Sequence, residues 1–139
     1  MDAALLDNLA RVSNIDDGEA QLFALFAEHD GWFLTTGDKR ALISLATRNE
    51  LVDLRERVAG RIVCLESVLK LLVQRNGARP TAQAFLALRA HRTINVLLSD
   101  PQTSSDHVCL QGIQSYLDDL IAETGQGFLY LPEVACDGT

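Results

Sequence analysis

Residues 32–42 read Trp-Phe-Leu-Thr-Thr-Gly-Asp-Lys-Arg-Ala-Leu, and this stretch decides the fold class. Its apolar, strand-favouring start reaches Thr-Thr-Gly, and Asp38 then opens a helical pattern of apolar residues. The pattern predicts a strand, a tight turn and a helix. Ligands of open α/β sheets bind beyond the carboxyl ends of the strands, so Asp38 is the first candidate for chemistry.

The remaining sequence predicts mostly helices and one further clear strand. A second strand is expected over residues 61–65, and residues 128–131 are expected to form an edge strand or a packed tail. Gly31 is the expected C-cap of the helix before the first strand. Alternation of strands and helices is typical of a parallel α/β architecture. Helices are expected over residues 2–12, 20–29, 39–47, 50–58, 66–75, 82–90 and 106–123.

Length and composition predict a single α/β domain over residues 1–139. Nearly half of the residues are apolar and proline is scarce, which excludes intrinsic disorder. The sequence has no signal-peptide pattern and no apolar run that could cross a bilayer, so a soluble, cytoplasmic protein without membrane contact is expected. Three widely spaced cysteines without a CxxC pair predict reduced thiols and no zinc site.

The charges are distributed unevenly along the chain. The net charge is -7, but residues 1–38 carry -7, residues 39–92 carry +7 and residues 93–139 carry -7. The cations of the middle segment have two interpretations. They are the solvated faces of helices, or they form a basic flank beside an acidic site, as a nuclease needs in order to hold a polyanion.

Acidic residues open two of the predicted helices. Asp16, Asp17 and Glu19 precede one apolar helix, and Asp38 precedes the next. Carboxylates at helix N-termini are favoured by the helix dipole, so capping explains these positions without any further function. Asp16 with Glu19 three residues later has the spacing of a capping box.

The same residues carry a resemblance to a known family. The sequence Asp-Gly-Glu-Ala-Gln at residues 17–21, an apolar helix, and then the stretch that ends in Thr-Thr-Gly-Asp resemble the central part of a PIN domain. The resemblance implies a Rossmann-like α/β fold, with a short parallel sheet flanked by many helices. Residues 1–75 would form the PIN-like core without the family's first strand, and residues 76–139 would form a mostly helical C-terminal extension.

The resemblance also implies a function. Many PIN domains are Mg²⁺- or Mn²⁺-dependent ribonucleases, and some are toxins of toxin-antitoxin pairs. Glu19 and Asp38 match two of the family's catalytic, metal-binding acids. Lys39 and Arg40 would contact substrate phosphate. The hydroxyl groups of Thr35 and Thr36 would orient a carboxylate or a water molecule.

The sequence departs from the family at its start. A PIN domain begins with a strand whose aspartate is the first metal ligand, whereas this sequence begins within a predicted helix. The nearest substitutes are Asp16, Asp17 and Glu66, and none of them matches the family pattern. Two acids hold a divalent ion weakly, so the expected nuclease activity is poor or absent.

The alternative interpretation is a non-catalytic, degenerate or truncated PIN-like module that binds other proteins. Its partner would be a second copy of the chain or an inhibitor protein of the antitoxin kind. A phospho-acceptor site is not supported, because no strand precedes Asp16. The chain also contains no GxGxxG, P-loop or nucleophile-elbow motif.

Overall fold

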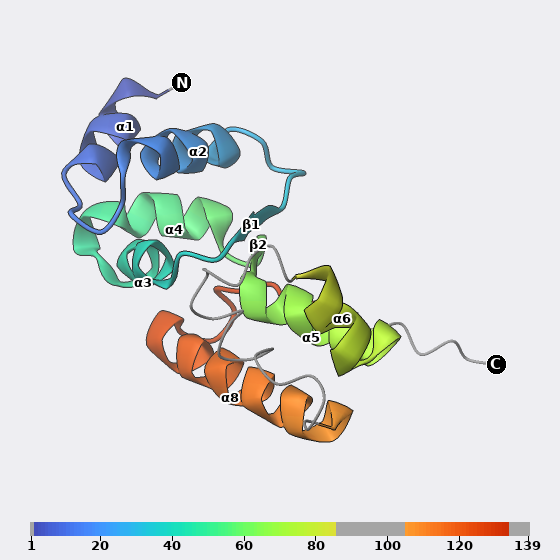
Figure 1. Cartoon of the computed structure of the whole chain (residues 1–139). Coiled ribbons are helices and arrows are strands. Elements are labelled where there is room, and N and C mark those ends of the chain that lie inside the picture. Colours follow the sequence, from blue (N-terminus) through green and yellow to red (C-terminus); the bar gives the residue numbers. More distant parts are fainter. Residues whose placement is uncertain (1, 86–104, 134–139) are drawn as a thin grey trace. The chain divides into compact units, whose positions relative to one another are not determined.

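Helices make up most of the structure. The computed structural model describes residues 2–85 and 105–133 of the 139-residue chain, and Figure 1 traces its course. The sequence also predicts a helix end or a strand over residues 94–98 and a polar loop over residues 99–105, and of these only residue 105 lies within the described residues. The elements in order are α1 (Ala3–Ala10), α2 (Asp17–Ala27), β1 (Leu34–Thr36), α3 (Lys39–Thr47), the 3-10 turn η1 (Asn49–Leu51), α4 (Val52–Val58), β2 (Ile62–Cys64), α5 (Leu65–Asn76), α6 (Ala78–Ala84) and α8 (Asp106–Thr124).

The two strands form a short parallel sheet, which confirms the predicted α/β class. Leu34 of β1 lies opposite Ile62 of β2, and the register continues to Thr36 opposite Cys64. On the other side of β2, Leu129 forms a single parallel bridge to Ile62. The segment predicted as an edge strand or a packed tail therefore contributes one bridging residue beside β2.

The chain divides into two compact units. The first unit contains residues 1–64 and 119–130, and the second contains residues 65–118 and 131–139. The division passes between β2 and α5, and it also crosses α8. The helix α5, which the sequence assigned to the PIN-like core, therefore groups with the helices that follow it. The two units are described separately below.

The core of the first unit lies where four helices meet the strands. Helix α1 packs against α2, and α3 and α2 each pack against α4. The amphipathic patterns explain these contacts, because the apolar positions of each helix recur on the buried face. The side chains at the centre have at most 2% of their surface exposed: Leu9, Phe23, Phe26, Leu42, Leu45, Leu51, Leu54, Val58 and Ile62.

Two predicted boundaries around β1 are wrong. Helix α2 ends at Ala27 with Glu28 as its C-cap in the right-handed region, so Gly31 does not cap it. The strand begins at Leu34 rather than at Trp32. The reason is a contact that is distant in sequence: the side chain of Arg61 binds the backbone carbonyl groups of His29 and Trp32 and holds the connection as a loop.

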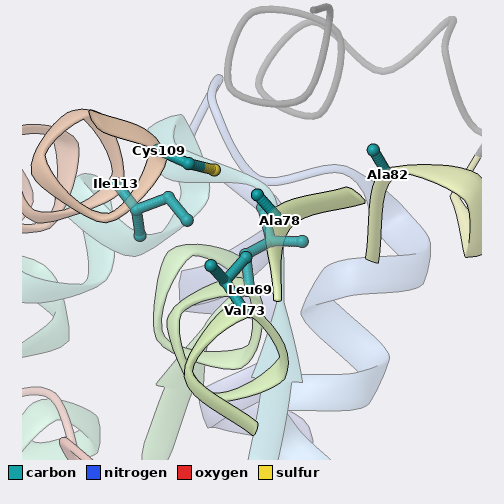
Figure 2. Close-up of a cluster of buried hydrophobic side chains, with 6 residues drawn as sticks. All are labelled: Leu69, Val73, Ala78, Ala82, Cys109 and Ile113. Atoms are coloured by element: carbon teal, nitrogen blue, oxygen red, sulfur yellow. The ribbon is translucent and has the colours of Figure 1, made fainter. Parts of the chain in front are cut away.

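The second unit has its own apolar core, shown in Figure 2. Leu69 and Val73 of α5 lie close to Ala78 at the start of α6, and Ile113 of α8 faces them. Asp106, the first residue of α8, accepts a hydrogen bond of 2.8 Å from the backbone N–H of Ala78 through its Oδ1 atom. This contact satisfies one of the free N–H groups at the start of α6.

The sequence predicts no segment that crosses a membrane. Among the described residues, no helix combines the length and the hydropathy that a membrane span requires.

Candidate functional site

Asp38 lies at the carboxyl end of β1, as the sequence predicted. It is the N-cap of α3, and its Oδ1 atom accepts a hydrogen bond of 3.0 Å from the backbone N–H of Ala41. Its own N–H donates to the hydroxyl oxygen of Thr36 at 3.1 Å. The carboxylate is therefore fixed from both sides by the turn between strand and helix.

Glu19 is fixed at the start of α2 by a capping box with Asp16. The Oδ1 atom of Asp16 accepts a hydrogen bond of 2.7 Å from the N–H of Glu19, and Oε2 of Glu19 accepts one of 3.1 Å from the N–H of Asp16. The predicted capping role is thus confirmed for both residues. Each of these caps uses one oxygen of its carboxylate and leaves the second oxygen outside the cap.

The two predicted acids lie near each other in the folded chain. The carboxyl groups of Glu19 and Asp38 are close enough to interact, although the residues stand at the starts of different helices. Partial burial is the main cause that raises the pKa of Glu19 above its usual value. The hydrogen bond to Asp38 and the negative charges of Asp38 and Asp16 raise that pKa further, against the lowering effect of the backbone bond to Asp16.

The residues around this pair differ in how the fold uses them. Thr36 positions the backbone of Asp38, whereas Thr35 is exposed on the opposite side of the strand. Lys39 and Arg40 occupy the first turn of α3, directly after Asp38, and Arg40 is exposed. Two cations thus follow the acidic pair in sequence, as the predicted phosphate contact requires.

The substitutes for a third acidic ligand lie in different places. Asp16 belongs to the cluster through its capping box with Glu19. Asp17 is exposed at the first position of α2. Glu66 is a residue of the second unit, where its side chain at the start of α5 is only 1% exposed. Over residues 2–85 and 105–133, no group of three or more His, Cys, Asp or Glu side chains is arranged to hold a metal ion.

Two cations of the basic middle segment have structural roles. Arg55 donates from Nε to the carbonyl of Leu45 and from Nη2 to that of Arg48, at 3.1 and 2.7 Å. Arg61 donates to three backbone carbonyl groups. The solvated-face interpretation therefore does not describe these two residues, because their guanidinium groups stabilise loops.

Sequence reasoning missed one feature near the site. Trp32, Phe33 and Tyr130 present aromatic rings to solvent, with exposed fractions of 50, 57 and 43%. The signal was present in the sequence, because Trp32 and Phe33 stand side by side, and both are exposed in the loop that precedes β1.

The effect of Glu19 on stability should depend on pH. Because the folded state raises its pKa above 4.5, folding binds a proton, and stability is lost as pH rises through the raised value. Glu19→Gln keeps the capping box, so the variant should match the parent protein at pH below 4.5 and become more stable at neutral pH. For a partly exposed charge the gain is roughly 0.2–1 kcal/mol.

Thermal melts of parent and variant across this pH range test the prediction. Glu56→Gln, which changes an exposed glutamate of α4, controls for the removal of one negative charge. A stability difference between Glu19→Gln and the parent that is constant across the pH range would contradict the assignment of the shift to Glu19.

The geometry of the pair has a chemical consequence. Two neighbouring carboxyl groups repel each other when both are ionised, and a proton or a cation between them relieves that repulsion. Oxygen ligands of this kind suit Mg²⁺ or Mn²⁺, which bind through one or two carboxylates and retain several waters.

Comparisons with models of known protein families, with curated proteins and with solved structures find no match for this chain.

Proposed function

We propose that the chain is a PIN-like protein of metal-dependent ribonuclease descent, in which Glu19 and Asp38 hold Mg²⁺ or Mn²⁺ beside an RNA phosphodiester. One observation carries the proposal: carboxyl groups 19 residues apart in sequence lie close enough to interact near the carboxyl end of β1. Capping alone does not require this proximity, because each helix N-terminus is satisfied by its own cap.

The residues of the site divide the work between them. The turn with Thr36 holds the carboxylate of Asp38 in a fixed position, and Glu19, whose pKa is raised, would supply the second oxygen ligand beside it. Lys39 and Arg40 attract the phosphate backbone of the substrate. A bound divalent ion supplies polarisation of a phosphodiester oxygen and a lowered pKa of the attacking water. Within the described residues, the cluster consists of Glu19 and Asp38 with Asp16 beside them. So few acids hold a divalent ion weakly, and the expected activity is therefore weak.

Cleavage of a labelled single-stranded RNA tests the proposal, with EDTA, Mg²⁺ and Mn²⁺ compared. Asp38→Asn keeps a competent N-cap and removes the charge, and we expect it to lower metal-stimulated cleavage at least about tenfold. Asp2→Asn is the matched control, because Asp2 caps α1 in the same way. Mn²⁺ should also raise the melting temperature of the parent and of Asp2→Asn, but not that of Asp38→Asn.

Full cleavage by Asp38→Asn, or cleavage that neither metal stimulates, would refute the proposed nuclease activity.

The second candidate function is that of a non-catalytic PIN-like module that binds another protein. A separate observation favours it: the exposed aromatic side chains beside β1, since exposed apolar groups that gather on one surface mark interaction sites.

A further inference from the structure

Four side chains of the first unit form a surface that we call the aromatic surface: His29, Trp32, Phe33 and Tyr130. The rings of His29 and Trp32 stack with their centroids 3.9 Å apart and an angle of 10° between their planes. Phe33 and Tyr130 meet edge to face at 4.9 Å. Trp32, Phe33 and Tyr130 are each about half exposed, so flat π faces of considerable area meet solvent.

Hydrogen bonds from Arg61 fix the backbone of the loop that carries His29 and Trp32. The guanidinium group of Arg61 donates to the carbonyl oxygens of His29 and Trp32 at 2.7 and 3.1 Å. It lies 4.5 Å from the centroid of the Phe26 ring, which is buried in the core. Surfaces that are ordered before binding lose little conformational entropy when a partner arrives.

Negative charge surrounds the aromatic surface. The first unit has thirteen acidic residues and seven lysines and arginines, which gives it a net charge of -6. Glu28 and Asp30 stand on either side of His29 in sequence, and both are exposed. Their position gives the exposed edge of the loop a negative field.

Acidic side chains line part of a hollow in the same unit. We call it the acidic hollow; its volume is about 160 Å³, and its lining includes Asp2, Glu50, Asp53 and one cation, Arg57. Oε1 of Glu28 accepts a hydrogen bond of 3.0 Å from the backbone N–H of Asp2. Glu28, which precedes His29 in sequence, therefore contacts a residue that lines the acidic hollow.

We propose that the aromatic surface and the acidic hollow together bind an arginine-containing basic segment of a partner protein. A guanidinium group is planar, so it stacks on exposed aromatic faces while its charge is attracted by the neighbouring carboxylates. Aromatic residues and arginine are the pair of residue types that most often dominate the energy of protein interfaces. This inference rests on the second candidate function and is independent of the metal site.

The charge decides between a protein and a nucleic acid at this surface. Single-stranded RNA also stacks on exposed aromatic rings, but its binding requires cations along the phosphate backbone. Here the charged residues of the loop before Trp32 are Glu28 and Asp30, and Arg61 donates to backbone carbonyl groups. A polyanion would be repelled where a basic peptide is attracted.

The single tryptophan of the chain makes the test specific to this surface. Trp32 fluorescence is measured during titration with an oligoarginine peptide, an oligolysine peptide of equal length and a single-stranded oligouridylate. We expect oligoarginine to change the fluorescence saturably. It should bind roughly two- to fivefold more tightly than oligolysine, the factor that one exposed cation–π contact supplies.

Variants separate this binding from general attraction to an acidic protein. Phe33→Ser and Asp30→Asn should each weaken oligoarginine binding by roughly two- to fivefold. The matched controls are Val108→Ser, which changes a side chain 54% exposed on α8, and Glu123→Gln, which removes an exposed charge from α8. Neither control should change the affinity.

Three results would overturn the proposal. The first is tighter binding of oligouridylate than of oligoarginine at Trp32, which would assign the surface to nucleic acid. The second is an unchanged Trp32 signal with every probe. The third is equal weakening by the Glu123→Gln control and by Asp30→Asn, which would reduce the interaction to net charge. None of these results depends on the cleavage assay, so the metal site and this surface can fail separately.

Discussion

Replacement of Phe23 by alanine should destabilise the first unit by about 3–5 kcal/mol, the usual cost of removing a buried aromatic ring. Phe23 is 1% exposed in the middle of α2. The other buried residues of this helix are three alanines and Phe26, and alanines are too short to move into the space that the ring leaves. Since whole domains are stable by about 5–15 kcal/mol, a large part of the folded population would be lost.

Urea unfolding followed by Trp32 fluorescence measures this effect, because the only tryptophan lies in the first unit. Leu22→Ala on the same helix is the control, since Leu22 is 44% exposed and its loss should change stability by about 0.5 kcal/mol or less. Equal unfolding midpoints for Phe23→Ala and Leu22→Ala would mean that α2 does not bury the helix face that carries Phe23.

The sequence predicted those parts of the fold that depend on local signals. The end of α4 is one example: the sequence predicts a helix over residues 50–58 that Gly60 closes, and Gly60, the residue after the C-cap, has a φ of 79°, which glycine adopts without strain. The parallel pairing of β1 with β2 followed from the helices between them. Asp38 fell at its predicted place because a strand, a turn and an N-cap all point to the same residue.

Features that depend on distant contacts escaped prediction. No local pattern reveals that Arg61 reaches back to His29, and this contact moves the start of β1 from Trp32 to Leu34. Similarly, the bridge from Leu129 to Ile62 joins segments 67 residues apart in sequence. Periodicity describes which face of an element is apolar, but it does not say which partner will cover that face.

Capping and chemistry are compatible at the acidic pair. Sequence reasoning set the two roles against each other, and the structure confirms the caps of Asp16, Glu19 and Asp38. A carboxylate has two oxygen atoms, and one of them suffices for a cap. The caps restrict the rotamers of Glu19 and Asp38 and leave the second oxygen of each carboxylate outside the cap. A rigid first layer of ligands is what a metal site requires.

Arg61 links the loop of the aromatic surface to the fold, and its replacement by methionine should cost about 2–4 kcal/mol. The variant retains an apolar stem against Phe26 but removes three hydrogen bonds from a charged donor, and it leaves the carbonyl groups of His29 and Trp32 without that donor. With the loop released, Trp32 fluorescence should change before any urea is added. Binding of oligoarginine should weaken, because the aromatic surface is no longer ordered in advance.

Arg61→Lys distinguishes geometry from charge. A lysine ammonium is a point charge and does not reproduce the planar fork that reaches the carbonyls of His29, Trp32 and Arg57, so this variant should regain only a minor part of the lost stability. Arg11→Met, at the exposed C-cap of α1, is the control for loss of a surface arginine and should stay within about 0.5 kcal/mol of the parent. Full recovery of stability and of the Trp32 spectrum by lysine would show that Arg61 acts through its charge alone. In that case, stacking of the His29 and Trp32 rings would have to order the loop before a partner binds.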